Sequence, residues 1–242
     1  MMKMIKLKRV LKPIYLTDAK VKELTEEFKK DKSKAVWKTK SIGDALLKSS
    51  SYKCAYCECE LQKEDSYMQV EHFKDKDKYP DDVVKWENLL PSCARCNRKK
   101  WTLDVNLNPI VNPYDDDPRI HLKQQAFRLY GKDLKGENTI EKLYLNDDDR
   151  VVYSRFLASN EISRQLSELT KISSNLDQLR NSMTKLLQAC QSDKPYSAFT
   201  AYTLHSNKDY GKLKDLLLKN NMWDADLIEL HDNSSYLQLD AR

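Results

Sequence analysis

Two pairs of cysteines near the middle of the chain have the spacing of a metal-binding site. Each pair has the form C-x-x-C, and the pairs are Cys54/Cys57 and Cys93/Cys96. A C-x-x-C segment places two sulfurs on one tight turn, so two such turns can close a cage of four thiolates. Structural zinc sites have this closed, tetrahedral sulfur coordination. We therefore expect these four cysteines to bind a structural Zn²⁺.

The same residues allow three alternatives. Cys59 lies beside the first pair and could replace Cys57 in the cage, or the four cysteines could be buried in reduced form without metal. Disulfides are the third alternative, but five of the six cysteines lie at positions 54–96 and no export signal is visible, which favours metal binding. Cys190 is expected to lie in a helical core.

The segment between the cysteine pairs carries a second set of candidate residues. A histidine has an ordinary pKa near neutrality and suits a general base, a role that we assign to His72. A hard cation such as Mg²⁺, or Mn²⁺, prefers oxygen ligands and could bind the carboxylate of Glu71 and the amide of Asn97. Such an ion neutralises phosphate charge and stabilises a departing oxygen. Because neighbours on a strand point to opposite faces, a bend is needed to bring Glu71 and His72 to one site.

Basic residues around the second cysteine pair suit the phosphate backbone of a nucleic acid. They are Arg95, Arg98, Lys99 and Lys100. Hydrolysis of a phosphodiester is therefore the leading hypothesis. The competing hypothesis is a non-catalytic zinc-knuckle adaptor that binds nucleic acid or protein. It explains the cysteines and the basic residues, but not the acid–histidine dipeptide.

The elements that must position these residues have local signals. Thr17 is a plausible N-cap for a helix whose apolar residues recur at helical spacing up to Phe28, and a second helix is expected around residues 42–47. The partly alternating stretch 68–73 predicts a strand. A charged loop, a returning segment at 86–91 and a helix that begins near Ala94 or Arg95 are expected to follow.

The remainder of the chain divides into an irregular part and a helical part. Residues 106–150 contain three closely spaced prolines, and the stretch 139–145 is expected to pair with 127–130 as a hairpin. From about residue 149 to 190, apolar residues recur every three or four positions, which predicts one long amphipathic helix or two joined end to end. The recurring residues are Ile162, Leu166, Leu169, Ile172, Leu176, Leu179, Met183 and Leu186. This stripe is expected to face a core, and a coiled-coil seam with a partner is the alternative.

Composition limits the class of protein. The chain has 242 residues, of which 40% are hydrophobic and 33% charged, and only four glycines, which argues against a turn-rich all-β fold. No apolar run is long enough for a transmembrane helix, and no secretory signal is visible, so we expect a cytoplasmic protein without a membrane partner. The net charge of +5 permits an anionic partner without requiring one.

The order of the motifs resembles the HNH endonuclease family. The stretches that carry the resemblance are C-A-Y-C at 54–57, E-H-F at 71–73 and W-E-N-L-L-P-S-C-A-R-C-N-R-K-K at 86–100. The resemblance implies a ββα-metal fold, His72 as the general base and Glu71 and Asn97 as metal ligands. It also implies that Asn88 supports the loop and orients the base. The last signature position is Asn rather than His, which leaves the preferred metal open because a transition ion favours imidazole.

A looser resemblance extends beyond the motif core. The stretches V-N-P-Y-D-D-D-P-R-I-H-L at 111–122 and T-I-E-K-L-Y-L-N at 139–146, with Arg155, are similar to HNH proteins of bacterial anti-phage systems. These are the nuclease subunit of Septu and its relatives encoded beside retron reverse transcriptases. The resemblance implies an ABC/SMC-like ATPase partner and, in retron systems, a reverse transcriptase with its RNA–DNA hybrid. It also implies a DNA or tRNA substrate.

Together these features predict an α+β protein that is mostly α. Four segments are expected: a basic N-terminal segment with helices (1–51), the HNH module (52–105), an irregular or hairpin extension (106–150) and a helical C-terminal region (151–242). The remaining histidines are not expected to join the site. They are His121, His205 and His231.

Overall fold

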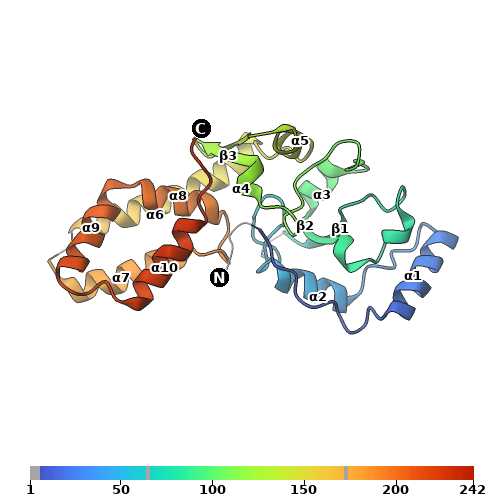
Figure 1. The fold of residues 1–242 in the computed structure, drawn as a ribbon, viewed down its shortest axis with the longest axis horizontal. Coiled ribbons are helices and arrows are strands. Elements are labelled where there is room, and N and C mark those ends of the chain that lie inside the picture. Colours follow the sequence, from blue (N-terminus) through green and yellow to red (C-terminus); the bar gives the residue numbers. More distant parts are fainter. Residues whose placement is uncertain (1–5, 64–65, 172–173) are drawn as a thin grey trace. The chain divides into compact units, whose positions relative to one another are not determined.

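The chain folds into two compact units. The computed structural model describes residues 6–63, 66–171 and 174–242, and its ribbon is drawn in Figure 1. The N-terminal unit contains residues 6–122 and 130–145, and the C-terminal unit contains 123–129 and 146–242. The fold is mostly helical with two small sheets, as expected for an α+β protein. Among the described helices, none combines the length and apolar character that a membrane crossing requires.

Two helices open the N-terminal unit, as the sequence predicts. Helix α1 (Asp18–Lys30) begins after Thr17, whose side chain accepts a hydrogen bond from the N–H of Lys20 at 3.1 Å. Helix α2 (Lys40–Ser49) begins after Thr39, which caps it in the same way. The apolar faces of both helices are buried together with the segment that follows β1. The buried side chains of this core include Leu24, Phe28, Ile42, Leu46, Val83 and Trp86.

A two-stranded antiparallel sheet followed by a helix forms the centre of this unit. Strand β1 (Met68–His72) pairs with β2 (Leu89–Cys93), so that His72 lies opposite Leu89. Helix α3 (Ala94–Lys100) follows β2 directly. Two 3₁₀ turns, η1 (Pro80–Asp82) and η2 (Trp86–Asn88), connect the strands. This β–β–α order confirms the fold expected for the module.

The predicted hairpin between residues 127–130 and 139–145 is wrong. Strand β4 (Arg128–Gly131) pairs instead with β3 (Leu122–Gln125), which follows the short helix α4 (Pro118–His121). Most of the other stretch belongs to helix α5 (Leu134–Lys142). Asp133 caps α5 by accepting a hydrogen bond from Gly136 N–H at 2.8 Å. The cap and the burial of Thr139 on the helix favour α5 over a strand.

Five α-helices account for most of the described C-terminal unit. After the π-helical turn η3 (Asp148–Val152) they are α6 (Tyr153–Lys171), α7 (Leu176–Ala189), α8 (Ser197–Ser206), α9 (Lys208–Lys219) and α10 (Ala225–Tyr236). Helix α6 lies beside α8 and α9, and α7 lies beside α10 (Figure 1).

The apolar stripe of residues 149–190 forms two separate helices and faces the core of this unit. Ile162, Leu166, Leu179 and Met183 belong to one buried cluster and are at most 3% exposed. The same cluster includes residues of α8, α9 and α10, so the core-facing interpretation is confirmed and the coiled-coil alternative is not needed. Ile172 lies outside the described residues.

Candidate functional site

A large cavity in the N-terminal unit brings most of the predicted catalytic residues together. It has a volume of about 970 Å³ and is lined by β1, by α3 and by residues 37–39 and 75–77. Glu71 and His72, from the end of β1, line the cavity together with Asn97 from α3. The chain therefore brings two neighbouring strand residues and an amide from the following helix to one space. This is the convergence that the proposed chemistry requires.

His72 is held in one orientation. Its Nε2 lies 2.8 Å from the carbonyl oxygen of Val83, and the ring of Trp37 meets it edge to face at a centroid distance of 4.6 Å. A carbonyl oxygen only accepts, so Nε2 carries the hydrogen and Nδ1 carries the lone pair of the neutral ring. Burial lowers the pKa of His72 to about 4, although the bond to Val83 opposes this shift. The imidazole is therefore neutral at pH 7, the state that a proton acceptor needs.

Asn88 holds the loop that supplies this carbonyl group. Its Oδ1 accepts a hydrogen bond from Lys74 N–H at 2.7 Å, and its Nδ2 donates to the carbonyls of Lys74 (3.1 Å) and Asp82 (3.0 Å). The side chain is buried and thus ties both ends of the loop that leads to Val83. The side chain of Asn88 acts on His72 through this loop, so its geometry is that of a positioning residue.

Glu71 forms a buried ion pair that the sequence did not predict. Lys100 Nζ lies 2.7 Å from Glu71 Oε1, and the two side chains are 1% and 2% exposed. The same ammonium donates to the carbonyl of His72 at 2.7 Å, and the hydroxyl of Tyr56 donates to Glu71 Oε2 at 2.7 Å. Lys100, expected from the sequence to contact a phosphate backbone, is directed inward and neutralises a buried carboxylate.

The other predicted residues of α3 lie at or near the cavity. Asn97 donates through Nδ2 to Gln69 Oε1 at 2.7 Å, which leaves Oδ1 as the atom with which this amide would bind a cation. Arg98 is exposed and lines the cavity. Lys99 is exposed and its Nζ lies 4.4 Å from the centroid of the Tyr144 ring, while Arg95 donates to the Tyr144 carbonyl.

The cavity also has residues that sequence reasoning missed. Two lysines approach it from other segments: Lys38, which is exposed and follows Trp37, and Lys76, which pairs with Asp77 at 3.0 Å. Two aromatic residues, Tyr67 and Trp101, line it as well. No local motif marks these residues, because only the folding of distant segments brings them to one space.

The oxygen donors of the cavity fit a hard divalent cation. A carboxylate oxygen has two lone pairs, so Glu71 retains acceptor capacity beyond its bonds to Lys100 and Tyr56. One carboxylate and one amide oxygen are a small ligand set, and Mg²⁺ is commonly bound by few protein ligands together with water and substrate phosphates. The donor chemistry therefore suits Mg²⁺ or Mn²⁺.

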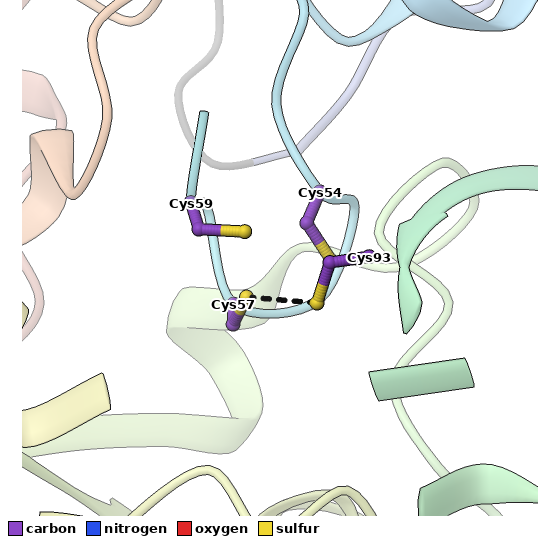
Figure 2. Close-up of side chains that lie close together, drawn as sticks. All are labelled: Cys54, Cys57, Cys59 and Cys93. Carbon is purple, nitrogen blue, oxygen red and sulfur yellow. Dashed lines mark hydrogen bonds between the residues drawn. The ribbon is translucent and has the colours of Figure 1, made fainter. Parts of the chain in front are cut away.

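Three of the four predicted zinc cysteines lie together, and the fourth sulfur of their group is that of Cys59. The Sγ atoms of Cys54, Cys57, Cys59 and Cys93 all lie within 4.8 Å of one another (Figure 2). Cys57 Sγ is 3.8 Å from Cys93 Sγ. Ligands about 2.3 Å from a tetrahedral zinc lie about 3.8 Å apart, so the spacing of this pair suits a zinc cage.

Cys96, the remaining predicted ligand, is outside this group but lies next to it, because its N–H donates to Cys93 Sγ at 3.4 Å. Hydrogen bonds with Cys54, Cys57 and Cys93, followed by burial, raise the pKa of Cys96 well above that of a free thiol. Arg95 points a guanidinium nitrogen at Cys96 Sγ from 3.7 Å. Cys59, expected to be a spare, thus has the place among the four clustered sulfurs that was expected for Cys96, and both are candidates for the fourth ligand.

Comparison with known proteins agrees with the geometry. Residues 54–102 match the model of the HNH endonuclease family. The chain is 40% identical to Septu protein PtuB of Bacillus thuringiensis, over 96% of this chain and 93% of that protein. The chain belongs to the Septu PtuB family.

More distant relatives cover less of this PtuB-family chain or share less identity. A Septu protein PtuB of Bacillus mycoides is 32% identical over 36% of the chain and 39% of its own length. Protein ea31 of Escherichia phage lambda is 25% identical over 79% of the chain and 65% of its own length. No solved structure matches the chain. The expected membership in the HNH family is thus confirmed, and the matched segment contains both cysteine pairs and the cavity residues of β1 and α3.

Proposed function

We propose that this PtuB-family chain is a metal-dependent endonuclease that hydrolyses nucleic-acid phosphodiesters. The observation that supports this most directly is the convergence of His72, Glu71 and Asn97 on one cavity. A neutral imidazole with a defined tautomer lies beside two oxygen donors of the kind that Mg²⁺ and Mn²⁺ prefer. A non-catalytic adaptor has no need of this arrangement.

In the proposed reaction, His72 Nδ1 accepts a proton from the water that attacks phosphorus. The Val83 carbonyl keeps the hydrogen on Nε2, and Asn88 holds the intervening loop, so the ring remains directed for this transfer. Glu71 and Asn97 would hold the divalent ion, which when bound neutralises phosphate charge and stabilises the leaving oxygen. Lys100 holds the Glu71 carboxylate in place, and Arg98 with Lys38 attracts the phosphate backbone.

The cysteine cluster has a structural role in this proposal. Zn²⁺ bound by Cys54, Cys57 and Cys93, with Cys96 or Cys59 as the fourth ligand, would join the segment before β1 to the start of α3. Such a closed site stabilises the strands and the helix that carry the cavity residues.

Membership of the Septu PtuB family supports a role as the effector of an anti-phage defence system that acts with an ATPase partner. DNA and tRNA are both substrates within this proposal, because the scissile phosphodiester is the same group in both. The relatives provide no support for a reverse transcriptase partner with its RNA–DNA hybrid, and that expectation remains a prediction from the sequence.

A cleavage assay with matched variants tests the proposal. Zinc-loaded protein, alone and with its ATPase partner, is incubated with plasmid DNA or tRNA and with Mg²⁺ or Mn²⁺. His72→Ala is expected to slow cleavage by about a hundredfold or more, because it removes the general base. His121→Ala, which removes a histidine outside the cavity, is the control and should cleave like the wild type. Folded protein that binds nucleic acid but never cleaves it under these conditions would favour the adaptor.

A further inference from the structure

Two large aromatic side chains on the cavity wall are not used by the core. Trp101 is 73% exposed and Tyr67 is 67% exposed, and both line the same cavity as His72 and Asn97. Tyr67 precedes β1 and Trp101 follows α3, so they come from opposite ends of the ββα module. Aromatic side chains exposed to this degree contribute little to the stability of the unit.

Trp101 has a backbone conformation that is unusual for a residue with a side chain. Trp101 ends α3 with φ 46° and ψ −130°, and its N–H donates to the carbonyl of Asn97 at 3.0 Å. L-residues with a side chain rarely adopt this conformation, and glycine adopts it readily. The chain therefore has a tryptophan at a position where the backbone conformation favours glycine. The side chain is also too exposed to stabilise the unit much by burial. Such positions persist most often at functional sites.

The charges around these rings indicate what they bind. The cavity is lined by three cations, Lys38, Lys76 and Arg98, and by three carboxylates, Glu71, Asp75 and Asp77. Lys76 pairs with Asp77 and Glu71 with Lys100, so the exposed Lys38 and Arg98 are the cations that attract the phosphates of an anionic chain. A groove that combines cations with exposed aromatic rings is the arrangement that binds single-stranded nucleic acid, since unpaired bases stack on the rings while the cations contact the phosphates. In a duplex the bases are stacked on one another, and their faces are not available to a protein side chain.

We propose that Trp101 and Tyr67 form a base-stacking platform that binds unpaired nucleotides beside the scissile phosphate. This inference rests on the proposed nuclease function and narrows its substrate class to single-stranded segments, loops and frayed ends. The platform binds nucleobases of DNA and RNA alike, because every base has a face on which a ring can stack.

Binding measurements in the His72→Ala background test the platform without cleavage. A labelled oligonucleotide is compared as a single strand, as a loop closed by a stem and as a blunt duplex, each in DNA and RNA form and at one salt concentration. The single strand and the loop are expected to bind about tenfold more tightly than the duplex. Trp101→Ala and Tyr67→Ala should each weaken binding of the single strand by about tenfold and leave duplex binding unchanged. Tyr15→Ala, which removes a less exposed ring outside the cavity, should change neither affinity.

A glycine at position 101 separates a binding role from a structural one. Trp101→Gly fits the observed φ, so the melting temperature should stay the same or rise by a few degrees while single-strand affinity falls as in Trp101→Ala. A large drop in melting temperature for Trp101→Gly would show that the ring supports the fold, and this would overturn the inference. Equal affinity for single strand and duplex, or aromatic variants that bind like their parent, would overturn it as well.

These outcomes are distinguishable from failure of the proposed nuclease function. If the wild type cleaves nucleic acid but the aromatic variants bind and cleave like the wild type, the platform is refuted and the nuclease remains. If the wild type never cleaves but single-strand binding depends on Trp101 and Tyr67, the platform is supported and the catalytic proposal fails.

Discussion

Replacing Lys100 with methionine should cost the N-terminal unit about 4 kcal/mol of unfolding free energy. The ammonium lies 2.7 Å from Glu71 Oε1, and both side chains are almost fully buried. Loss of one partner of a buried ion pair costs about 3–5 kcal/mol, because the remaining charge is left in a poorly solvated place. We expect about 3 kcal/mol from this source, since Glu71 lines a cavity that water can enter. The carbonyl of His72 also loses its donor, which costs about 1 kcal/mol more.

A double-mutant cycle separates the ion pair from other effects of the substitution. Glu71→Gln removes the carboxylate charge, so Lys100→Met should cost less in the Glu71→Gln background than in the wild type, by about 2 kcal/mol or more. Lys99→Met is the matched control. It removes an exposed neighbour of the same type and should change stability by no more than about 0.5 kcal/mol.

Urea unfolding of zinc-loaded protein, followed by tryptophan fluorescence, is a suitable assay. Three of the four tryptophans belong to the N-terminal unit, so the signal reports mainly on that unit; they are Trp37, Trp86 and Trp101. The reasoning is refuted if Lys100→Met is as stable as Lys99→Met. It is also refuted if the effects of Lys100→Met and Glu71→Gln on the unfolding free energy are strictly additive in the cycle.

Further predictions concern the metal cage, the loop and the dependence on pH. Cys93→Ser should lose zinc and much of the fold of the N-terminal unit, because metal binding and folding are coupled, and a folded variant with full zinc content would contradict the cage. The zinc affinities of Cys59→Ser and Cys96→Ser should differ, and the variant with the large loss of zinc affinity identifies the fourth ligand. Equal, small losses of zinc affinity would show that neither residue is required. Asn88→Ala should cost about 2–3 kcal/mol in urea unfolding, because it leaves buried backbone groups of the loop without their partner, and should slow cleavage; wild-type stability would exclude this role. Burial lowers the pKa of His205 to about 4, so the unfolded chain, with a pKa near 6.5, binds this proton first. The unfolding free energy should therefore fall by about 2 kcal/mol, after allowance for partial exposure, as the pH drops from about 6.5 to about 4. His205→Gln should make this slope shallower, and an unchanged slope would contradict the assignment.

Several elements of the N-terminal unit could be predicted from the sequence because their signals are local. An N-cap threonine, a short alternating run and the C-x-x-C spacing each act over a few residues, and α1, β1 and α3 lie where these signals place them. The hairpin prediction failed where the local signal was ambiguous. The stretch 139–145 was expected to form a strand, but the cap at Asp133 and the burial of Thr139 favour α5.

The sequence was sufficient to identify the candidate side chains, because residue type alone shows which groups can bind a metal or accept a proton. These candidates are the cysteine pairs, the acid–histidine dipeptide and the two asparagines. The partners of those side chains are set by contacts between segments far apart in the chain. Lys100 and Glu71 are 29 positions apart, and only the packing of α3 against β1 turns a basic residue of a charged run inward to a buried carboxylate. The cavity itself, with Lys38, Tyr67 and Trp101 on its wall, likewise exists only in the folded chain. The sequence by itself thus identifies the side chains that are candidates for the site. Their burial, their charge partners and their accessibility from the cavity depend on how the whole unit packs.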